Sequence, residues 1–252
     1  MTEETTGPEP ELHALLRQAH ALLGQATERT EHAVTPAWRR VTEGEPRWPV
    51  SVAVLVMIAL QFGLPPELHV GPVWLGPAVE LVLLVTLMAA NPGRVNRDHP
   101  GLRALGIALI VVATAANADS VAHLVSGLVA GTFGSQSRPL LLDGASIWLT
   151  NVIVFALWYW ESDRGGPSAR AHARSRYPDF LFPQMSDPAP ADPEWEPGFV
   201  DYLYVSFTNA AAFSPTDTMP LSRWAKLTML LQSSVSLVTV ALVIARAVNI
   251  LA

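Results

Sequence analysis

Six polar side chains stand inside long apolar stretches of this 252-residue chain: Glu80, Asn117, Asp119, His123, Asp143 and Asn151. An ionisable group within a bilayer costs about 2.5–3.5 kcal/mol on insertion scales, so each one is a functional candidate by default. Asp119 and His123 are four residues apart and so share one helical face. A carboxylate beside an imidazole can relay protons or hold a cation, since histidine titrates near neutral pH.

The same polar side chains also have a structural interpretation. The helix that carries Asp119 and His123 can leave the membrane near Asn117, which places both groups in water. Alternatively, polar groups on neighbouring helices can bond to one another and hold the bundle together. Because hydrocarbon does not tolerate an unpaired charge, we expect Asp119 and His123 to face the helix bundle and not lipid.

The composition indicates that a lipid bilayer surrounds the chain. Half of the residues are apolar, only 15% are charged, and the mean hydropathy is +0.29. Soluble domains are nearer to a quarter charged. Long windows without charge match the roughly 20 apolar residues that cross a membrane core of about 30 Å. The sequence therefore predicts a multi-pass integral membrane protein.

Several functional classes are excluded or disfavoured. The chain has no cysteine, which excludes disulfide frameworks and thiolate metal sites. Its net charge of -6 argues against a nucleic-acid partner. The zinc-protease, nucleophile-elbow and phosphate-loop motifs are all absent. We therefore expect no enzyme activity, cofactor or metal. Arginine supplies 15 of the 16 basic residues, which is typical of a GC-rich bacterial genome and favours a bacterial plasma membrane.

The apolar stretches predict an all-α fold with about six membrane segments, at residues 48–64, 73–90, 102–131, 140–160, 199–213 and 221–251. The first four form a bundle over residues 48–160. A cytoplasmic region, residues 1–47, precedes it and holds an amphipathic helix from Pro10 that can pack on the protein, lie on the membrane or associate with copies of itself. Residues 161–198 form a proline-rich loop, for which we expect mostly extended backbone. A helical unit, residues 199–252, follows.

Arginine positions predict the orientation. Twelve arginines cluster before residue 48, at 94–103 and in the proline-rich loop. The positive-inside rule then places the N-terminus and that loop in the cytoplasm. With this orientation, residues 199–213 cross as a short fifth helix, and residues 214–221 form an outer turn. The residues of 199–213 are also compatible with a re-entrant helix.

The stretch 204–249 resembles the pore helix, filter and inner helix of potassium-channel-type tetrameric cation channels. The matching residues are Ser206, Phe207, Asp217 and Pro220, while Ser222 and Lys226 fall at a Thr and an Arg of the family pattern. The resemblance implies a pore-domain-like helical hairpin and a homo-oligomer around a shared axis. It also implies that the proline-rich loop is outside, which disagrees with the arginine positions.

The filter-equivalent residues are Ala212, Phe213, Ser214, Pro215, Thr216 and Asp217. A potassium filter needs glycines to align its column of carbonyl groups. Here both glycines are absent and Pro215 intrudes, so we expect no potassium selectivity. Asp217 is expected to be mainly structural and to accept hydrogen bonds from amides of its own turn.

The chain also resembles a family of uncharacterised bacterial integral membrane proteins, a domain of unknown function. The resemblance covers the plan of four segments and a proline-rich loop, followed by the motifs D-x-L-Y-x-S-F and S-x-x-D and a last helix that ends in A-V-N. These motifs are formed by Asp201, Leu203, Tyr204, Ser206, Phe207, Ser214, Asp217, Ala247, Val248 and Asn249.

Two functional hypotheses remain. The first is a channel-like protein that forms a cation or proton pathway without potassium selectivity. The alternative is a non-conducting interaction or scaffold protein.

The last segment carries a polar streak that bears on this choice. It consists of Gln232, Ser233, Ser234, Ser236 and Thr239. In a channel some of these side chains line the pore, whereas hydroxyl groups in a helix can also bond to their own backbone carbonyls. Polar residues that face a shared axis favour conduction, and an apolar axis favours the alternative.

Overall fold

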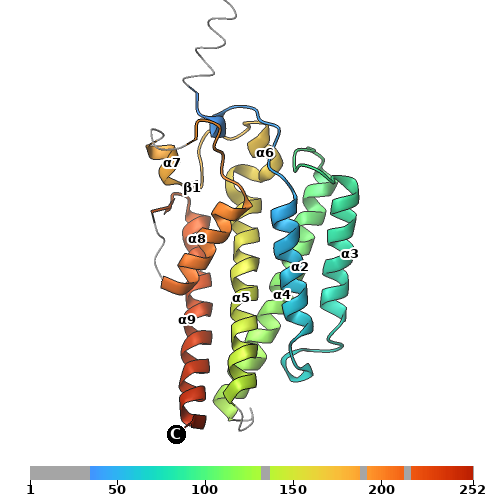
Figure 1. Cartoon of the computed structure of the whole chain (residues 1–252), viewed down its shortest axis with the longest axis vertical. Coiled ribbons are helices and arrows are strands. Elements are labelled where there is room, and N and C mark those ends of the chain that lie inside the picture. Colours follow the sequence, from blue (N-terminus) through green and yellow to red (C-terminus); the bar gives the residue numbers. More distant parts are fainter. Residues whose placement is uncertain (1–34, 132–136, 188–191, 213–216, 252) are drawn as a thin grey trace, which may run out of the picture.

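The computed structural model describes residues 35–131, 137–187, 192–212 and 217–251, and it is mostly helical (Figure 1). The predicted all-α class is thereby confirmed. Within the described residues, three helices are long and apolar enough to cross a membrane: Pro100–Ala130, Pro139–Gly165 and Arg223–Ile250. The predicted amphipathic helix from Pro10 lies outside the described residues.

Helices α2 (Trp48–Phe62), α3 (Leu75–Ala90), α4 (Pro100–Ala130) and α5 (Ser137–Ser162) form an antiparallel bundle (Figure 1). Their ends lie within a few residues of the predicted ones, because prolines and turn residues flank the apolar stretches. Helices α2 and α3 have 15 and 16 residues, below the roughly 20 that a full span needs.

Helix α5 is the centre of the molecule and packs against α2, α4, α8 (Phe199–Ala212) and α9 (Arg223–Leu251). Fully buried side chains such as Ile147, Leu157 and Tyr159 line its length. Gly144 lets α9 approach closely, since a Cβ atom there would lie 2.8 Å from a methyl carbon of Val243. The hydrophobic core therefore joins the N-terminal bundle to the C-terminal unit through α5.

The proline-rich loop differs from the extended segment that we expected. It contains two short helices, α6 (Pro167–Ala171) and α7 (Pro183–Ser186), and a short strand, β1 (Phe180–Leu181). Both helices begin with proline, whose fixed φ and missing N–H suit the first helical position. The prolines that exclude one long helix thus start short ones.

Helix α8 enters the bundle and does not cross it, so the structure does not confirm the predicted short fifth span. At its start, the backbone amide of Phe199 donates to Glu45. Beyond its end, β2 (Met219–Pro220) pairs antiparallel with β1, and the amide of Leu221 donates to the Asp179 carbonyl over 2.7 Å. Phe199 and Leu221 therefore lie at the same end of the bundle, and α9 runs from there to the opposite end (Figure 1). Helix α8 has 14 residues and is about 21 Å long, which is short enough for the helix to end inside the bundle.

We call this end of the bundle the arginine end, defined by residues 35–47, 91–99 and 161–187 and the start of α9. The re-entrant course of α8 brings Arg223 and Lys226 to it. If α8 crossed the bundle, Arg223 and Lys226 would lie at the opposite end from the other arginines. The structure thus brings the start of α9 to the same end of the bundle as the arginines of the proline-rich loop.

Cysteine labelling tests this arrangement. A cysteine at Ser168 and a cysteine at Asp217 are expected to react with a membrane-impermeant maleimide from the same side, and a cysteine at Glu67, in the α2–α3 connection, from the other. By the positive-inside rule, the side shared by residues 168 and 217 is the cytoplasm, so in intact cells only the cysteine at position 67 is labelled. Labelling of residues 168 and 217 from opposite sides would contradict the re-entrant course.

Candidate functional site

A buried polar network joins α5, α8 and α9 at the C-terminal unit. The Gln232 side chain, with 0% of its surface exposed, lies at its centre. Its Oε1 accepts hydrogen bonds from the Tyr159 hydroxyl at 2.6 Å and from Asn209 Nδ2 at 2.8 Å. Its Nε2 donates to Ser206 Oγ at 2.7 Å. Every polar atom of this amide thus has a partner within the same chain.

Two other members of the polar streak, Ser233 and Ser236, also bond to α8. Ser236 Oγ donates to the Ala210 carbonyl and accepts from Trp148 Nε1, both at 2.7 Å. Ser233 Oγ donates to Asn209 Oδ1 at 3.1 Å, and the exposed Ser234 donates to a carbonyl of its own helix at 2.9 Å. Three polar side chains of α9 therefore hold the re-entrant helix in place.

The faces of α8 and α9 that point away from the rest of the chain are apolar. The exposed apolar residues are Val200, Tyr204 and Phe207 on α8, with Leu227, Leu230, Leu231, Leu237, Val238, Ile244 and Val248 on α9. This surface suits lipid or the apolar face of another membrane helix. Ser234 is the member of the polar streak that lies on it.

The filter-equivalent residues fall at the end of the re-entrant helix. Ala212 is the last residue of α8, and Asp217 is exposed just before β2. Phe213, Ser214, Pro215 and Thr216 lie outside the described residues. The structural role of Asp217 therefore stays a prediction.

Three of the intramembrane candidates, Glu80, Asn117 and Asn151, take part in polar pairs between helices. Glu80, with 0% of its surface exposed, accepts hydrogen bonds from Gln61 Nε2 on α2, at 3.0 and 3.2 Å. Asn117 on α4 donates to Asn151 Oδ1 on α5 at 3.3 Å. Both pairs match the structural interpretation, in which polar groups tie helices together.

Asp119 and His123 lie beside the connection between α2 and α3. Asp119 accepts a hydrogen bond from the amide of Val70 in that connection at 2.8 Å, and His123 Nδ1 is 3.3 Å from its carboxylate. About a third of each side chain is exposed, 30% for Asp119 and 36% for His123. Asp143 is also partly exposed. This placement favours the interpretation in which these groups lie near water.

No sequence motif pointed to the ionic cluster that is buried at the arginine end. Arg170 donates from Nη2 to Glu45 Oε1 at 2.8 Å and from Nη1 to the carbonyls of Trp160 and Asp163, at 2.6 and 3.0 Å. Asp163, with 0% of its surface exposed, accepts from the Tyr202 hydroxyl at 2.5 Å. The cluster binds the N-terminal segment, the proline-rich loop and α8 to one another.

The loop turns sharply where it enters this cluster. Arg164 has a φ of 54° and is followed by two glycines with positive φ, Gly165 and Gly166. A Cβ atom at Gly166 would lie 2.9 Å from the Glu161 carbonyl oxygen, which explains glycine at that position. Arg164 itself donates to the carbonyls of Ser175 and Trp38.

Burial and charge act in opposite directions on Glu45 and Arg170. Burial raises the pKa of the Glu45 carboxyl above its usual value, while Arg170 lowers it. Burial lowers the pKa of Arg170, but Tyr202, Glu45 and Asp163 outweigh it, so the pKa is raised overall. Arg170 therefore keeps its charge. The only sequence signal for this cluster was the set of arginines in the loop, which we used to predict orientation.

The structure thus indicates a helical membrane protein, with three helices suited to crossing a bilayer. No group of three or more His, Asp or Glu side chains that could hold a metal ion occurs within the described ranges. No family model, curated protein or solved structure matches the chain. The resemblances to a channel pore domain and to a bacterial membrane-protein family therefore support proposals only.

Proposed function

We propose that this chain is a non-conducting membrane interaction or scaffold protein with a pore-domain-like C-terminal unit. The observation that carries the proposal is the use of the α9 polar streak inside the chain. Gln232 and Ser236 are buried and bonded to α8 and α5. They are therefore not free to line an aqueous path.

The exposed surface supports the same proposal. The outer faces of α8 and α9 present leucine, valine and isoleucine, which suit lipid, a second copy of the chain or another apolar helix. An axis lined by such side chains repels ions, since hydrophobic constrictions close a pore by losing water. We propose that copies of this chain associate through these faces.

A channel-like protein without potassium selectivity is the second candidate. It is favoured by the order of elements: a long helix α5, a re-entrant helix α8, a return to the same end and a long helix α9. This is the order that the pore-domain resemblance implies. The absent filter glycines argue against potassium selectivity here.

Ion flux through liposomes distinguishes the candidates. Purified protein in liposomes is expected to give potassium, sodium and proton fluxes equal to those of protein-free liposomes, and gramicidin added afterwards shows that the vesicles respond. Flux above that background, with a reversal potential that does not follow potassium, would replace the proposal with the second candidate. A strongly potassium-selective current would also contradict the expectation drawn from the filter positions.

A further inference from the structure

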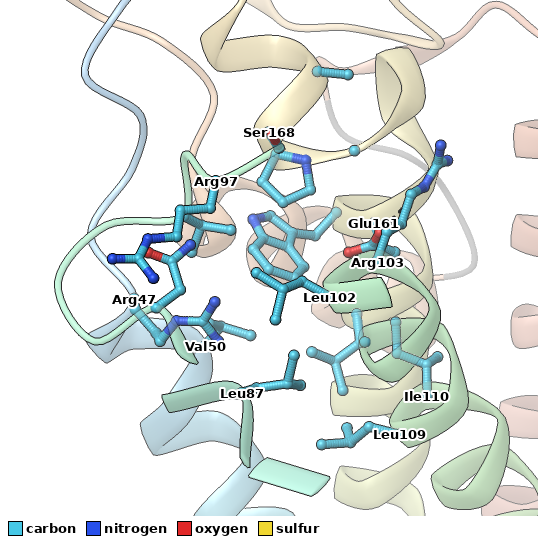
Figure 2. A pocket seen from close by; sticks show the side chains of 18 of the residues that line it. Arg47, Val50, Leu87, Arg97, Leu102, Arg103, Leu109, Ile110, Glu161 and Ser168 are labelled. Atoms are coloured by element: carbon cyan, nitrogen blue, oxygen red, sulfur yellow. Dashed lines mark ion pairs between the residues drawn. The ribbon is translucent and has the colours of Figure 1, made fainter. Parts of the chain in front are cut away.

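A cavity of about 110 Å³ lies between α2, α3, α4 and α5 at the arginine end, below the turn that starts α6 (Figure 2). Its inner part is apolar and is lined by Val50, Val54, Leu84, Leu87, Leu109 and Ile110. An engineered apolar cavity of about 150 Å³ is large enough to bind benzene. This cavity is smaller than that one, so it has room for only a short stretch of one acyl chain and not for two chains side by side.

The mouth of the cavity is basic. It is lined by Arg47, Arg97, Arg103 and Arg174, together with two carboxylates, Asp98 and Glu161. Arg174 pairs with Asp98, and Arg103 Nε is 3.7 Å from Glu161. Arg97 donates to the carbonyl oxygen of Ala90 at 2.6 Å. The four guanidinium groups outnumber the carboxylates, so the mouth has a net positive charge.

Arg47 is the residue that points to a ligand. Only 7% of its surface is exposed, and its Nε has no hydrogen-bond partner among the described residues. Figure 2 shows its side chain directed from the start of α2 towards the cavity. A buried donor without a partner costs roughly 1–3 kcal/mol, and more when it is charged. An anionic group at the mouth would supply the missing acceptor.

We propose that this cavity binds a single-chain anionic amphiphile, with its acyl chain between α2, α3 and α4 and its carboxylate or phosphate head against Arg47. The cavity lies at the end of the bundle that is rich in arginine, where basic side chains attract anionic head groups from the membrane surface. This site is separate from the C-terminal unit, so it can exist whether or not the protein conducts ions.

Photolabelling tests the site directly. The probe is decanoic acid with a diazirine near the end of its chain, added to the purified full-length protein in phosphatidylcholine nanodiscs. Mass spectrometry is expected to find the label on the cavity segments of α2, α3 and α4, around Val54, Leu84 and Leu109. Unlabelled decanoate or decyl phosphate is expected to compete, whereas decanol, which has no charge, is not.

Two variants separate the head group from the chain. R47Q is expected to lower labelling about tenfold, the loss of one charge-assisted hydrogen bond. Arg176→Gln, an exposed arginine outside the cavity, is the matched control and is expected to label like the unmodified protein. Leu87→Trp fills the cavity without altering a charge and is expected to abolish labelling, which keeps the test decisive if R47Q does not fold.

The competition and labelling results decide whether the site exists and which head group it binds. Competition by only one of the two anions supports the site and identifies the head group as carboxylate or phosphate. Equal competition by decanol, unchanged labelling in Leu87→Trp, or unchanged labelling in a folded R47Q would overturn the proposal. Block by phosphatidylglycerol without block by either single-chain anion would also overturn it, in favour of a two-chain lipid.

Discussion

Replacement of Arg170 by Met is expected to lower the free energy of unfolding by about 3–5 kcal/mol, the usual cost of removing one partner from a buried ion pair. The change leaves Glu45 and Asp163 buried without the cation that bonds to both residues. In a protein of this size the loss corresponds to a fall in Tm of roughly 10 °C. Thermal unfolding of the purified protein in a mild detergent measures it.

A matched control lies in the same loop. Arg174 also pairs with a carboxylate, that of Asp98, but 56% of its side chain is exposed. Arg174→Met is therefore expected to cost no more than about 1 kcal/mol, as surface ion pairs do. The double variant E45Q/R170M is expected to regain part of the loss, because a neutral amide replaces the unpaired carboxylate. Equal Tm values for the two single arginine variants would contradict a structural role for the ionic cluster.

The second large loss of folding stability is expected when Gln232 is replaced. Gln232→Leu leaves the Tyr159 hydroxyl without its acceptor and removes a partner from Asn209 and Ser206. Each buried polar group left without a partner costs about 1–3 kcal/mol, so we expect a loss of about 2–4 kcal/mol. The control is Ser234→Ala on the exposed face of the same helix, which is expected to change stability by less than about 0.5 kcal/mol.

A second substitution, in the Tyr159 partner, shows whether Gln232 stabilises the protein through its buried hydrogen bonds. Adding Tyr159→Phe to Gln232→Leu is expected to restore part of the lost stability, because removing both partners of a buried hydrogen bond can be nearly neutral. Additive losses in the double variant would show that the two side chains do not act together. A Gln232→Leu protein of normal stability with altered ion flux would instead show that the amide faces an aqueous path.

The sequence by itself determined where the helices are. Apolar stretches bounded by signals such as the Asn91-Pro92-Gly93 turn located the six longest helices of the described residues to within a few residues, since these signals act through neighbouring positions. It also identified the polar side chains inside these helices. It did not identify their partners, such as Gln61 for Glu80, because the two lie on different helices.

Only the tertiary structure decided the direction of α8. A 14-residue apolar helix can be a thin span or a re-entrant one, and its own residues are compatible with both. The pairing of Phe180 with Pro220 and the bond from Phe199 to Glu45 bring both ends of this segment to the arginine end. The ionic cluster around Arg170 and the cavity beside Arg47 depend in the same way on residues far apart in the chain. Local spacing determines helices, whereas burial of charges and closure of a loop depend on contacts that form only when the whole chain is folded.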